Sequence, residues 1–201
     1  MRAIVIQKFG GPENLVIKEL PDPEPKPGHV VIQVKAFGIN HAEMHMRRGE
    51  WAEAAEVSGI ECVGLVKSCP GGEFAVGTKA AALMGGLGRT INGSYAEYTR
   101  APATNVAPIE SDLSWEELAA IPESYATAWT CLFRNLEVAP GQTTDRQAGK
   151  ENRWEMPKHK VSSTTTLSRL GVLNSACGLA VFRNPCDRTS TPPTPASPPQ
   201  T

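Results

Sequence analysis

Short apolar runs that end at glycine or proline recur from residue 2 to residue 100, and they constrain the fold more than any other feature of the sequence. Residues 2–7 and 15–20 are two such runs, and the turn residues between them predict a hairpin-like pair. A connector with four prolines, residues 21–28, must be extended. It leads into the clearest strand, HVVIQVKAFG, at residues 29–38.

The strand pattern resumes at residue 58. Residues 58–69 are expected to form a second long strand, and a turn at Val76–Gly77 precedes another strand that ends at residue 83. Residues 92–100 return to a strand pattern. Strands at such short spacing, joined by glycine and proline turns, are typical of a small β-barrel. The sequence therefore predicts a mainly β fold with flanking helices.

Three helical segments are expected beside these strands. Residues 42–48 have helical propensity and are followed by glycine, a common helix stop. Ser114 is expected to cap a short helix, because Glu117 stands three residues on, at the capping-box position. Pro122 opens a helix over residues 122–135 that is apolar along one face and ends at a proline-glycine turn.

The charge balance and amino-acid composition of the sequence change near residue 143. Residues 1–142 hold 12 Lys and Arg against 17 Asp and Glu, whereas residues 143–201 hold 8 against 4. The second part has no sustained period of 2 or 3.6, and its last sixteen residues include five prolines and six serines or threonines. We expect one folded domain, residues 1–142, and an irregular, largely disordered tail, residues 143–201.

Overall composition excludes several classes of function. A formal net charge of −1 gives no reason to expect a nucleic acid or an anionic membrane as partner. The five cysteines are scattered, without a C-x-x-C pair, so reduced thiols are expected. The longest stretch of small apolar residues in the tail, residues 171–182, is shorter than the roughly 20 residues of a membrane helix. These features predict a soluble, cytoplasmic protein.

The segment GINHAEMHMRRG, residues 38–49, concentrates polar side chains directly after the strong strand. It could be a metal site, a metal-free substrate pocket or a solvated turn. His41 and His45 are four residues apart and could share a helical face, but a zinc site needs further ligands at suitable spacing. Asn40 could equally be a turn residue bonded to backbone, and His45 an exposed helix residue.

Four separated blocks of this sequence, in order and spacing, resemble one known family. The blocks are PGHVVIQVKAFGINHAEMHMRRG, SGIECVG, GSYAEY and PESYATAWTCL. They resemble the N-terminal catalytic domain of the medium-chain dehydrogenase/reductase superfamily, and most of all its zinc-free, quinone oxidoreductase-like branch. The resemblance covers residues 1–142 and implies a GroES-like, partly open β-barrel that is normally joined to a Rossmann domain carrying NADPH.

The same resemblance implies a site without metal. Asn40 stands where zinc alcohol dehydrogenases of the superfamily have a cysteine ligand, and Ile60 stands where they have a histidine. An amide and an alkyl side chain cannot replace a thiolate and an imidazole around tetrahedral zinc. We therefore expect no metal-binding residues. Glu61, beside Ile60, is expected in a buried polar network and not as an acid or base.

For catalysis, the resemblance implies hydride delivery from the nicotinamide to the β-carbon of an enone or quinone, with hydrogen-bond donors stabilising the carbonyl oxygen. Asn40 is expected on the cleft floor near nicotinamide and substrate. His45 stands where relatives often have tyrosine and could donate a hydrogen bond or a proton. Thr127 is expected to contact the nicotinamide carboxamide. A tailoring enzyme of secondary metabolism would fit this chemistry.

The sequence departs from the family after residue 143. No glycine-rich dinucleotide fingerprint follows there, so NADPH binding by this chain is doubtful. We expect a truncated, zinc-independent reductase that is inactive alone, with a tail from truncation or a shifted or unspliced frame. A non-catalytic binding or interaction domain, or a non-functional product of a truncated gene, are the alternatives. An uncovered apolar face on residues 122–135 could also form homo-oligomers.

Overall fold

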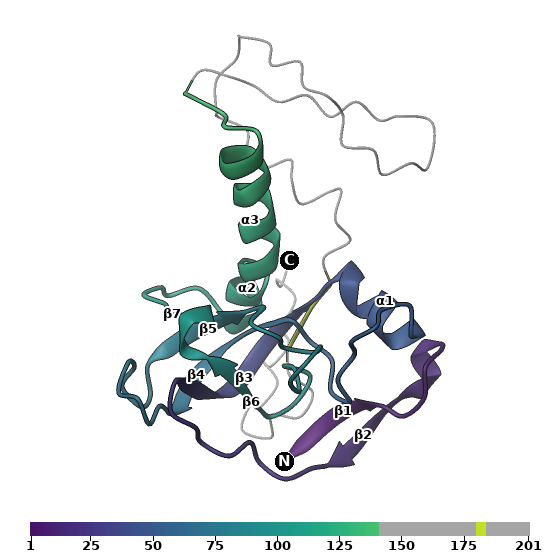
Figure 1. Ribbon diagram of the computed structural model, residues 1–201. Coiled ribbons are helices and arrows are strands. Elements are labelled where there is room, and N and C mark those ends of the chain that lie inside the picture. The colour runs from purple at the N-terminus through teal and green to yellow at the C-terminus, as the bar shows by residue number, and fades with distance from the viewer. Residues whose placement is uncertain (141–179, 184–201) are drawn as a thin grey trace, which may run out of the picture.

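A curved antiparallel sheet forms the body of the molecule. The computed structural model describes residues 1–140 and 180–183, and Figure 1 shows the sheet with its helices gathered above and beside it. The strands are β1 (Arg2–Ile6), β2 (Leu15–Glu19), β3 (His29–Ile39), β4 (Glu61–Ser68), β5 (Lys79–Leu83), β6 (Tyr98–Pro102), β7 (Val106–Pro108) and β8 (Ala180–Arg183). The partly open, mainly β barrel that the sequence predicts is confirmed.

Strand β3 pairs with three other strands of this sheet, β4, β6 and β8. The strand order is β6-β3-β4-β5-β7, and β8 also pairs with β3. Strand β6 pairs with the first half of β3, from His29 to Gln33, and β8 pairs with its last part, from Ala36 to Ile39. Strands β1 and β2 form a separate two-stranded sheet, the hairpin-like pair that the sequence predicts. Strand β4 pairs with β3 as far as Ala36, and β8 pairs with the end of β3 that leads to Asn40.

The core lies in two apolar layers on opposite sides of β3. Alternate residues Val30, Ile32 and Val34 enter the main cluster, which strand β6 and the loop residue Tyr95 help to close. The second, smaller cluster lies under helix α2 (Trp115–Ala119), where Leu118 and Ala119 cover Ala36 and Val63. Simple alternation would put Ala36 on the same face as Val34, and the register shift between these two residues in the β3–β4 pairing accounts for its place in the second cluster.

Helix α3 (Pro122–Trp129) continues directly into a π-helix, η3 (Thr130–Asn135), and the two project away from the sheet as one rod (Figure 1). Neither helix has a buried residue. The helix predicted over residues 122–135 is confirmed in extent, but its last turns have π geometry. Two short 3₁₀ turns complete the fold, η1 (Pro12–Asn14) and η2 (Ala103–Asn105).

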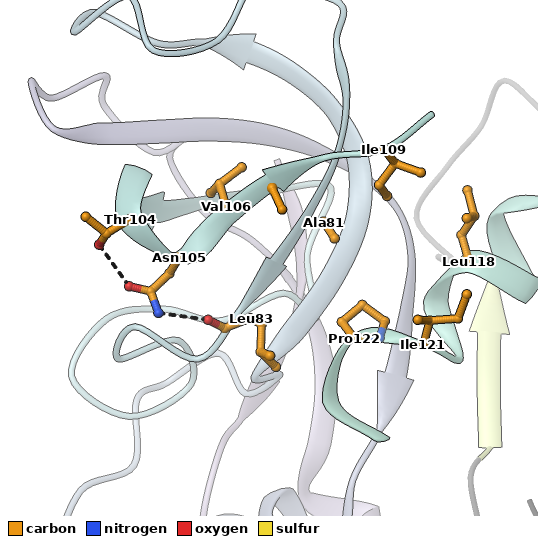
Figure 2. Close-up of a pocket in the computed structure, with 10 residues that line it drawn as sticks. Ala81, Leu83, Thr104, Asn105, Val106, Ile109, Leu118, Ile121 and Pro122 are labelled. Atoms are coloured by element: carbon orange, nitrogen blue, oxygen red, sulfur yellow. Dashed lines mark hydrogen bonds between the residues drawn. The ribbon is translucent and has the colours of Figure 1, made fainter. Parts of the chain in front are cut away.

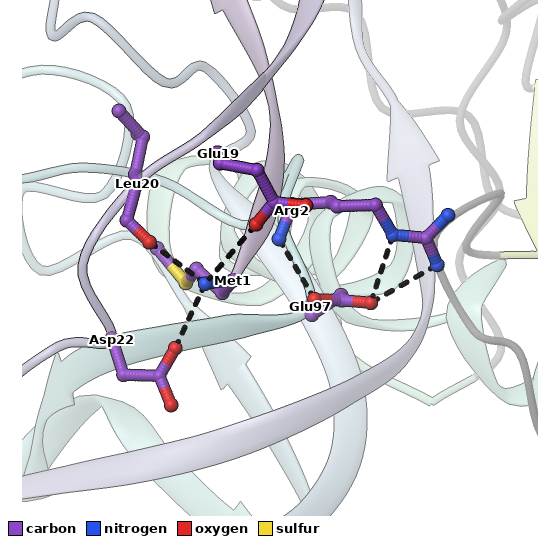
Figure 3. A network of polar contacts seen from close by, with 6 residues as sticks. All are labelled: Met1, Arg2, Glu19, Leu20, Asp22 and Glu97. Atoms are coloured by element: carbon purple, nitrogen blue, oxygen red, sulfur yellow. Dashed lines mark hydrogen bonds and ion pairs between the residues drawn. The ribbon is translucent and has the colours of Figure 1, made fainter.

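Polar contacts at the N-terminus fasten β1 to the rest of the barrel (Figure 3). The Met1 ammonium donates to the Leu20 carbonyl at 2.7 Å and pairs with Asp22 at 3.0 Å. The Arg2 backbone N–H donates to the Glu97 carboxylate at 2.7 Å, and the Arg2 guanidinium pairs with the same carboxylate at 3.1 Å. Each charge therefore has a partner from another segment of the fold.

Several boundaries differ from the sequence predictions for local reasons. Strand β4 begins at Glu61 and not at residue 58, because Gly59 has φ +102, outside the strand region. Strand β6 begins at Tyr98 and not at residue 92. Strand β8 lies within residues 143–201, for which the sequence predicts irregular structure. The remainder of that range, and with it the predicted tail, lies outside the described residues.

Candidate functional site

The site begins where β3 ends. Helix α1 (His41–Arg48) follows at once, with Asn40 as its N-cap residue in extended conformation. The backbone N–H of Asn40 donates to the Glu43 carboxylate at 2.5 Å, which is the reciprocal half of a capping box. Gly49 ends the helix with φ 75, the left-handed conformation that glycine adopts without strain. The helix and the glycine stop are both as predicted.

Glu43 connects α1 to the barrel. Its carboxylate is buried, and besides Asn40 it accepts from the Tyr95 hydroxyl at 2.8 Å and from the Ile60 backbone N–H at 3.0 Å. Burial raises the pKa of Glu43, and these hydrogen bonds oppose the shift. A carboxylate with donors from three segments holds the first turn of α1 against the loop before β4.

Glu61 is the second buried carboxylate, and it is only 1% exposed. One oxygen accepts from the Asn40 side-chain amide at 2.8 Å, and the other accepts from the Glu123 backbone N–H, also at 2.8 Å. Burial raises the pKa of Glu61 to about 7, although both hydrogen bonds lower it. Glu123 is in the first turn of α3, so Glu61 also satisfies an N–H that a helix start leaves unpaired.

These contacts join two of the three site residues that the resemblance implies. Thr127 is exposed on α3, and its hydroxyl donates to the Glu123 side chain at 2.9 Å. A continuous path therefore runs from Asn40 through Glu61 and Glu123 to Thr127. The predicted buried network around Glu61 is confirmed by these contacts. The roles of Asn40 and Thr127 toward a ligand stay predictions.

His45 lies apart from this path. Its ring nitrogen Nδ1 is in hydrogen-bond contact with the Glu50 carboxylate, and this contact lowers the pKa of Glu50. The ring stacks on Trp51 at 6.4 Å with 3° between the planes, and meets His41 edge-on at 4.9 Å. The contacts that the structure gives for His45 thus lie on α1 itself, at His41, and just after the helix, at Glu50 and Trp51. Its role as a donor stays a prediction.

An apolar cavity of about 440 Å³ lies beside the start of α3 (Figure 2). Apolar side chains from β5, β7 and α2 line it together with Pro122, the first residue of α3. Its polar groups satisfy one another, because the Thr104 hydroxyl donates to Asn105 and the Asn105 amide donates to the Leu83 carbonyl. Asn40, His45 and Thr127 are not among its lining residues.

Metal ligands do not gather in the part of the chain that the structure describes. No three His, Cys, Asp or Glu side chains lie close enough there to hold an ion. Ile60 is buried, and its backbone N–H bonds to Glu43, while the Asn40 amide bonds to Glu61. In residues 1–140 and 180–183, none of the helices is both long and apolar enough to cross a bilayer.

Comparison with known proteins identifies the family of this barrel. Residues 26–111 match the model of the alcohol dehydrogenase GroES-like domain. Human quinone oxidoreductase is 32% identical over 151 residues, which cover 71% of this chain and 44% of that protein. This chain belongs to the medium-chain dehydrogenase/reductase superfamily.

Solved structures of the medium-chain dehydrogenase/reductase superfamily have the same fold as the described domain. An NAD-dependent alcohol dehydrogenase superposes with a TM-score of 0.65 and 34% identity, over 71% of this chain and 49% of that one. A mycobacterial protein complexed with NADPH superposes with a TM-score of 0.59 and 29% identity, over 66% and 39%. This chain therefore spans less than half of the length of the quinone oxidoreductase and of the alcohol dehydrogenase, 44% and 49% respectively.

Sequence reasoning missed the part that Glu43 plays in this superfamily member. The signal was available, since Asn40 and Glu43 have the spacing of a capping box. Burial of Glu43 against Tyr95 depends on contacts across 52 residues of sequence, which no local pattern indicates. The second bond of Glu61, to the start of α3, is hidden for the same reason.

Proposed function

We propose that residues 1–142 form the substrate-binding half of a zinc-independent, NAD(P)H-linked reductase that acts on an enone or quinone. The observation that carries this proposal is the placement of Asn40. It caps α1 beside two buried carboxylates and is joined through Glu61 to the helix that bears Thr127. Membership of a family that includes quinone oxidoreductases supports the reaction class.

The local chemistry supports a pocket without zinc. At the two positions where zinc enzymes of the family have ligands, this chain has an amide that bonds to Glu61 and a buried alkyl side chain. Neither group is a zinc ligand in proteins. We therefore assign no step to a metal and give the role of polarising the carbonyl oxygen to hydrogen-bond donors.

Asn40 suits such a donor role. Its side-chain nitrogen carries two hydrogens, and Glu61 accepts one of them. The second can donate to a carbonyl oxygen, and an adjacent carboxylate strengthens a donor by polarising it. When bound, a nicotinamide would supply the hydride, and we propose that Thr127 contacts its carboxamide. His45 remains our second candidate donor, and its contact with Glu50 would orient the ring.

This proposal is tested by calorimetric titration of the purified chain with a water-soluble 1,4-quinone, in EDTA and then with added zinc. We expect saturable binding that the chelator leaves unchanged. Binding that first requires zinc would contradict the metal-free assignment. No binding up to the solubility limit would contradict the substrate assignment itself.

The cofactor side is a separate part of the proposal. Residues 144–201 contain no glycine-rich dinucleotide turn, so we propose that these 201 residues alone bind NADPH too weakly for turnover. NADPH titration followed by nicotinamide fluorescence checks this, with no saturation expected at millimolar cofactor. Saturable micromolar binding would show that the chain completes its own cofactor site.

A second candidate function is an interaction domain, and helix α3 favours it. Four apolar side chains recur every four residues along α3 and its continuation η3. They are Ile121, just before α3, Tyr125 and Trp129 on α3, and Phe133 on η3, and they are 37%, 52%, 60% and 49% exposed. Trp129 and Phe133 contact each other at 5.8 Å between ring centroids. An exposed aromatic stripe on a projecting helix is a surface that proteins usually cover. We propose that it mediates association of two copies of this chain.

A further inference from the structure

One buried side chain connects two parts of the fold that the sequence separates widely. Glu61 accepts from Asn40 across 21 residues and from Glu123 across 62 residues. Each carboxylate oxygen takes one of the two donors, at 2.8 Å in both cases. The side chain is therefore a bridge between the N-cap of α1 and the first turn of α3.

The neighbouring backbone leaves room for this bridge. A Cβ atom on Gly38 would lie 2.2 Å from the Glu61 oxygen that bonds to Asn40, and 3.3 Å from the Ala119 carbonyl. Gly38 is in β3, two residues before Asn40, and its φ is not in the left-handed region. The glycine is thus needed for space and not for backbone conformation.

We propose that Glu61 is a positioning residue, which holds the Asn40 amide and the first turn of helix α3 in a fixed relation to each other. Its meaning for catalysis rests on the proposed function, in which Asn40 faces the substrate and Thr127 the nicotinamide. The mechanical coupling itself needs no ligand and can be measured without one.

The geometry says how this coupling responds to substitution. Glu61→Asp keeps the charge but is one methylene shorter, so it cannot reach both donors. Glu61→Gln keeps the length, and its oxygen can still accept from the Glu123 N–H. Its NH₂ would then face the Asn40 NH₂, so the Asn40 amide must turn over and accept through its own oxygen. The two variants separate length from hydrogen-bond polarity.

Protonation provides a further readout, because several titratable groups surround Glu61. Glu43 on α1 and Glu123 on α3 both oppose its ionisation electrostatically, and burial opposes it most. Tyr95 and Cys62 also interact electrostatically with Glu61. Both probes of the bridge, the Glu123 amide and the Asn40 side-chain amide, are direct donors to the titrating group. If Glu61 joins them, both resonances should shift together as it titrates.

The test is a ¹⁵N–¹H NMR pH titration of the full chain as wild type, Glu61→Gln, Glu61→Asp and Asn40→Ala. In the wild type we expect one shared midpoint for the two amides. Glu61→Gln should abolish that transition and retain slow hydrogen exchange at Glu123. Glu61→Asp should speed exchange of the Glu123 amide by about tenfold or more, and Asn40→Ala should move the midpoint seen at Glu123.

Outcomes that overturn the proposal are equally definite. Separate midpoints for the two amides, or a Glu123 resonance that ignores Asn40→Ala, would show that Glu61 fills space without coupling them. Both variants alter the buried group, so a purely space-filling role predicts that they change exchange of the Glu123 amide alike. Slow exchange that is retained in Glu61→Gln and lost in Glu61→Asp shows positioning, and equal exchange in the two variants would overturn it. Failure of quinone binding would leave these results unchanged, so the two proposals stand or fall separately.

Discussion

The side-chain nitrogen of Asn40 lies 2.8 Å from an oxygen of Glu61, and the other oxygen of that carboxylate holds the start of helix α3. This relationship places a family-implied site residue in contact with a buried, titratable group. Because Asn40 donates directly to Glu61, the stability of the domain and the orientation of Asn40 should both depend on whether Glu61 is protonated.

The first prediction is a pH dependence of stability. The pKa of Glu61 is raised from 4.5 to about 7, so the folded state favours the protonated form. The stability that the folded state gains from protonated Glu61 is fully present below about pH 4.5, and it is lost as the pH rises to about 7. The full loss is about 3 kcal/mol in the free energy of unfolding.

Urea denaturation between pH 4.5 and pH 8 measures this loss in the wild type and in Glu61→Gln, which lacks the titrating group. In the variant, the free energy of unfolding should lose most of its pH dependence in this range. Some dependence remains because the pKa of buried Glu43 is also raised. Glu53→Gln, at an exposed ion pair with Arg89, should behave like the wild type. If the free energy of unfolding changed with pH in the same way in the wild type and in Glu61→Gln, Glu61 would not be the group responsible.

The second prediction concerns a matched pair of buried serines. The Ser58 hydroxyl has no hydrogen-bond partner within the described structure, whereas the Ser94 hydroxyl donates to the Glu61 carbonyl. Ser58→Ala should therefore raise the free energy of unfolding, and Ser94→Ala should lower it, each by about 1 kcal/mol. Chemical denaturation of the two variants at one pH gives the comparison. Equal effects of the same sign would contradict this picture of the two hydroxyls.

A third prediction tests the space beside Glu61. Gly38→Ala should destabilise the domain by about 1–3 kcal/mol, because the new methyl would displace the buried Glu61 carboxylate. Gly71→Ala is the control, since its Cβ would meet only the exposed Glu73 side chain, which can move away. Thermal or urea unfolding of both variants decides the matter. Comparable losses in the two would mean that Gly38 is not specially constrained.

Local patterns predicted most of the fold. The strand from His29 follows from the four prolines before it and its apolar content, and the α2 cap follows from Ser114 and Glu117. Strand β7 was missed because three residues are too few to show a period. Strand β8 was missed because its pairing with β3 depends on contacts that no local pattern carries.

The site was predictable only in part, for the same reason. Asn40 was named because it follows a strong strand and matches a family motif. Its partner on α3 could not be named, because the bond from the Glu123 N–H to Glu61 spans 62 residues and uses a backbone donor common to every residue type. Thr127 and His45 were named by resemblance, and the structure links only Thr127 to Asn40.

The exposed stripe along α3 and η3 gives a fourth prediction. If two copies of the chain associate through it, sedimentation equilibrium should show a concentration-dependent dimer. Trp129→Ala should weaken that dimer by about tenfold, since large aromatic side chains dominate such contacts. Val76→Ala shortens an apolar side chain elsewhere that is 71% exposed, and it should have no effect. A monomer at all concentrations would argue against self-association.

The most direct measurement compares quinone binding by the wild type, Asn40→Ala and Asn14→Ala, by calorimetry in EDTA. Loss of one donor to the carbonyl oxygen should weaken binding about 5- to 10-fold in Asn40→Ala. Asn14, whose side chain bonds only locally to Gly11 and Glu13, should be replaceable without effect. Equal affinities for the wild type and Asn40→Ala would contradict the account of this domain as a metal-free substrate pocket built on Asn40.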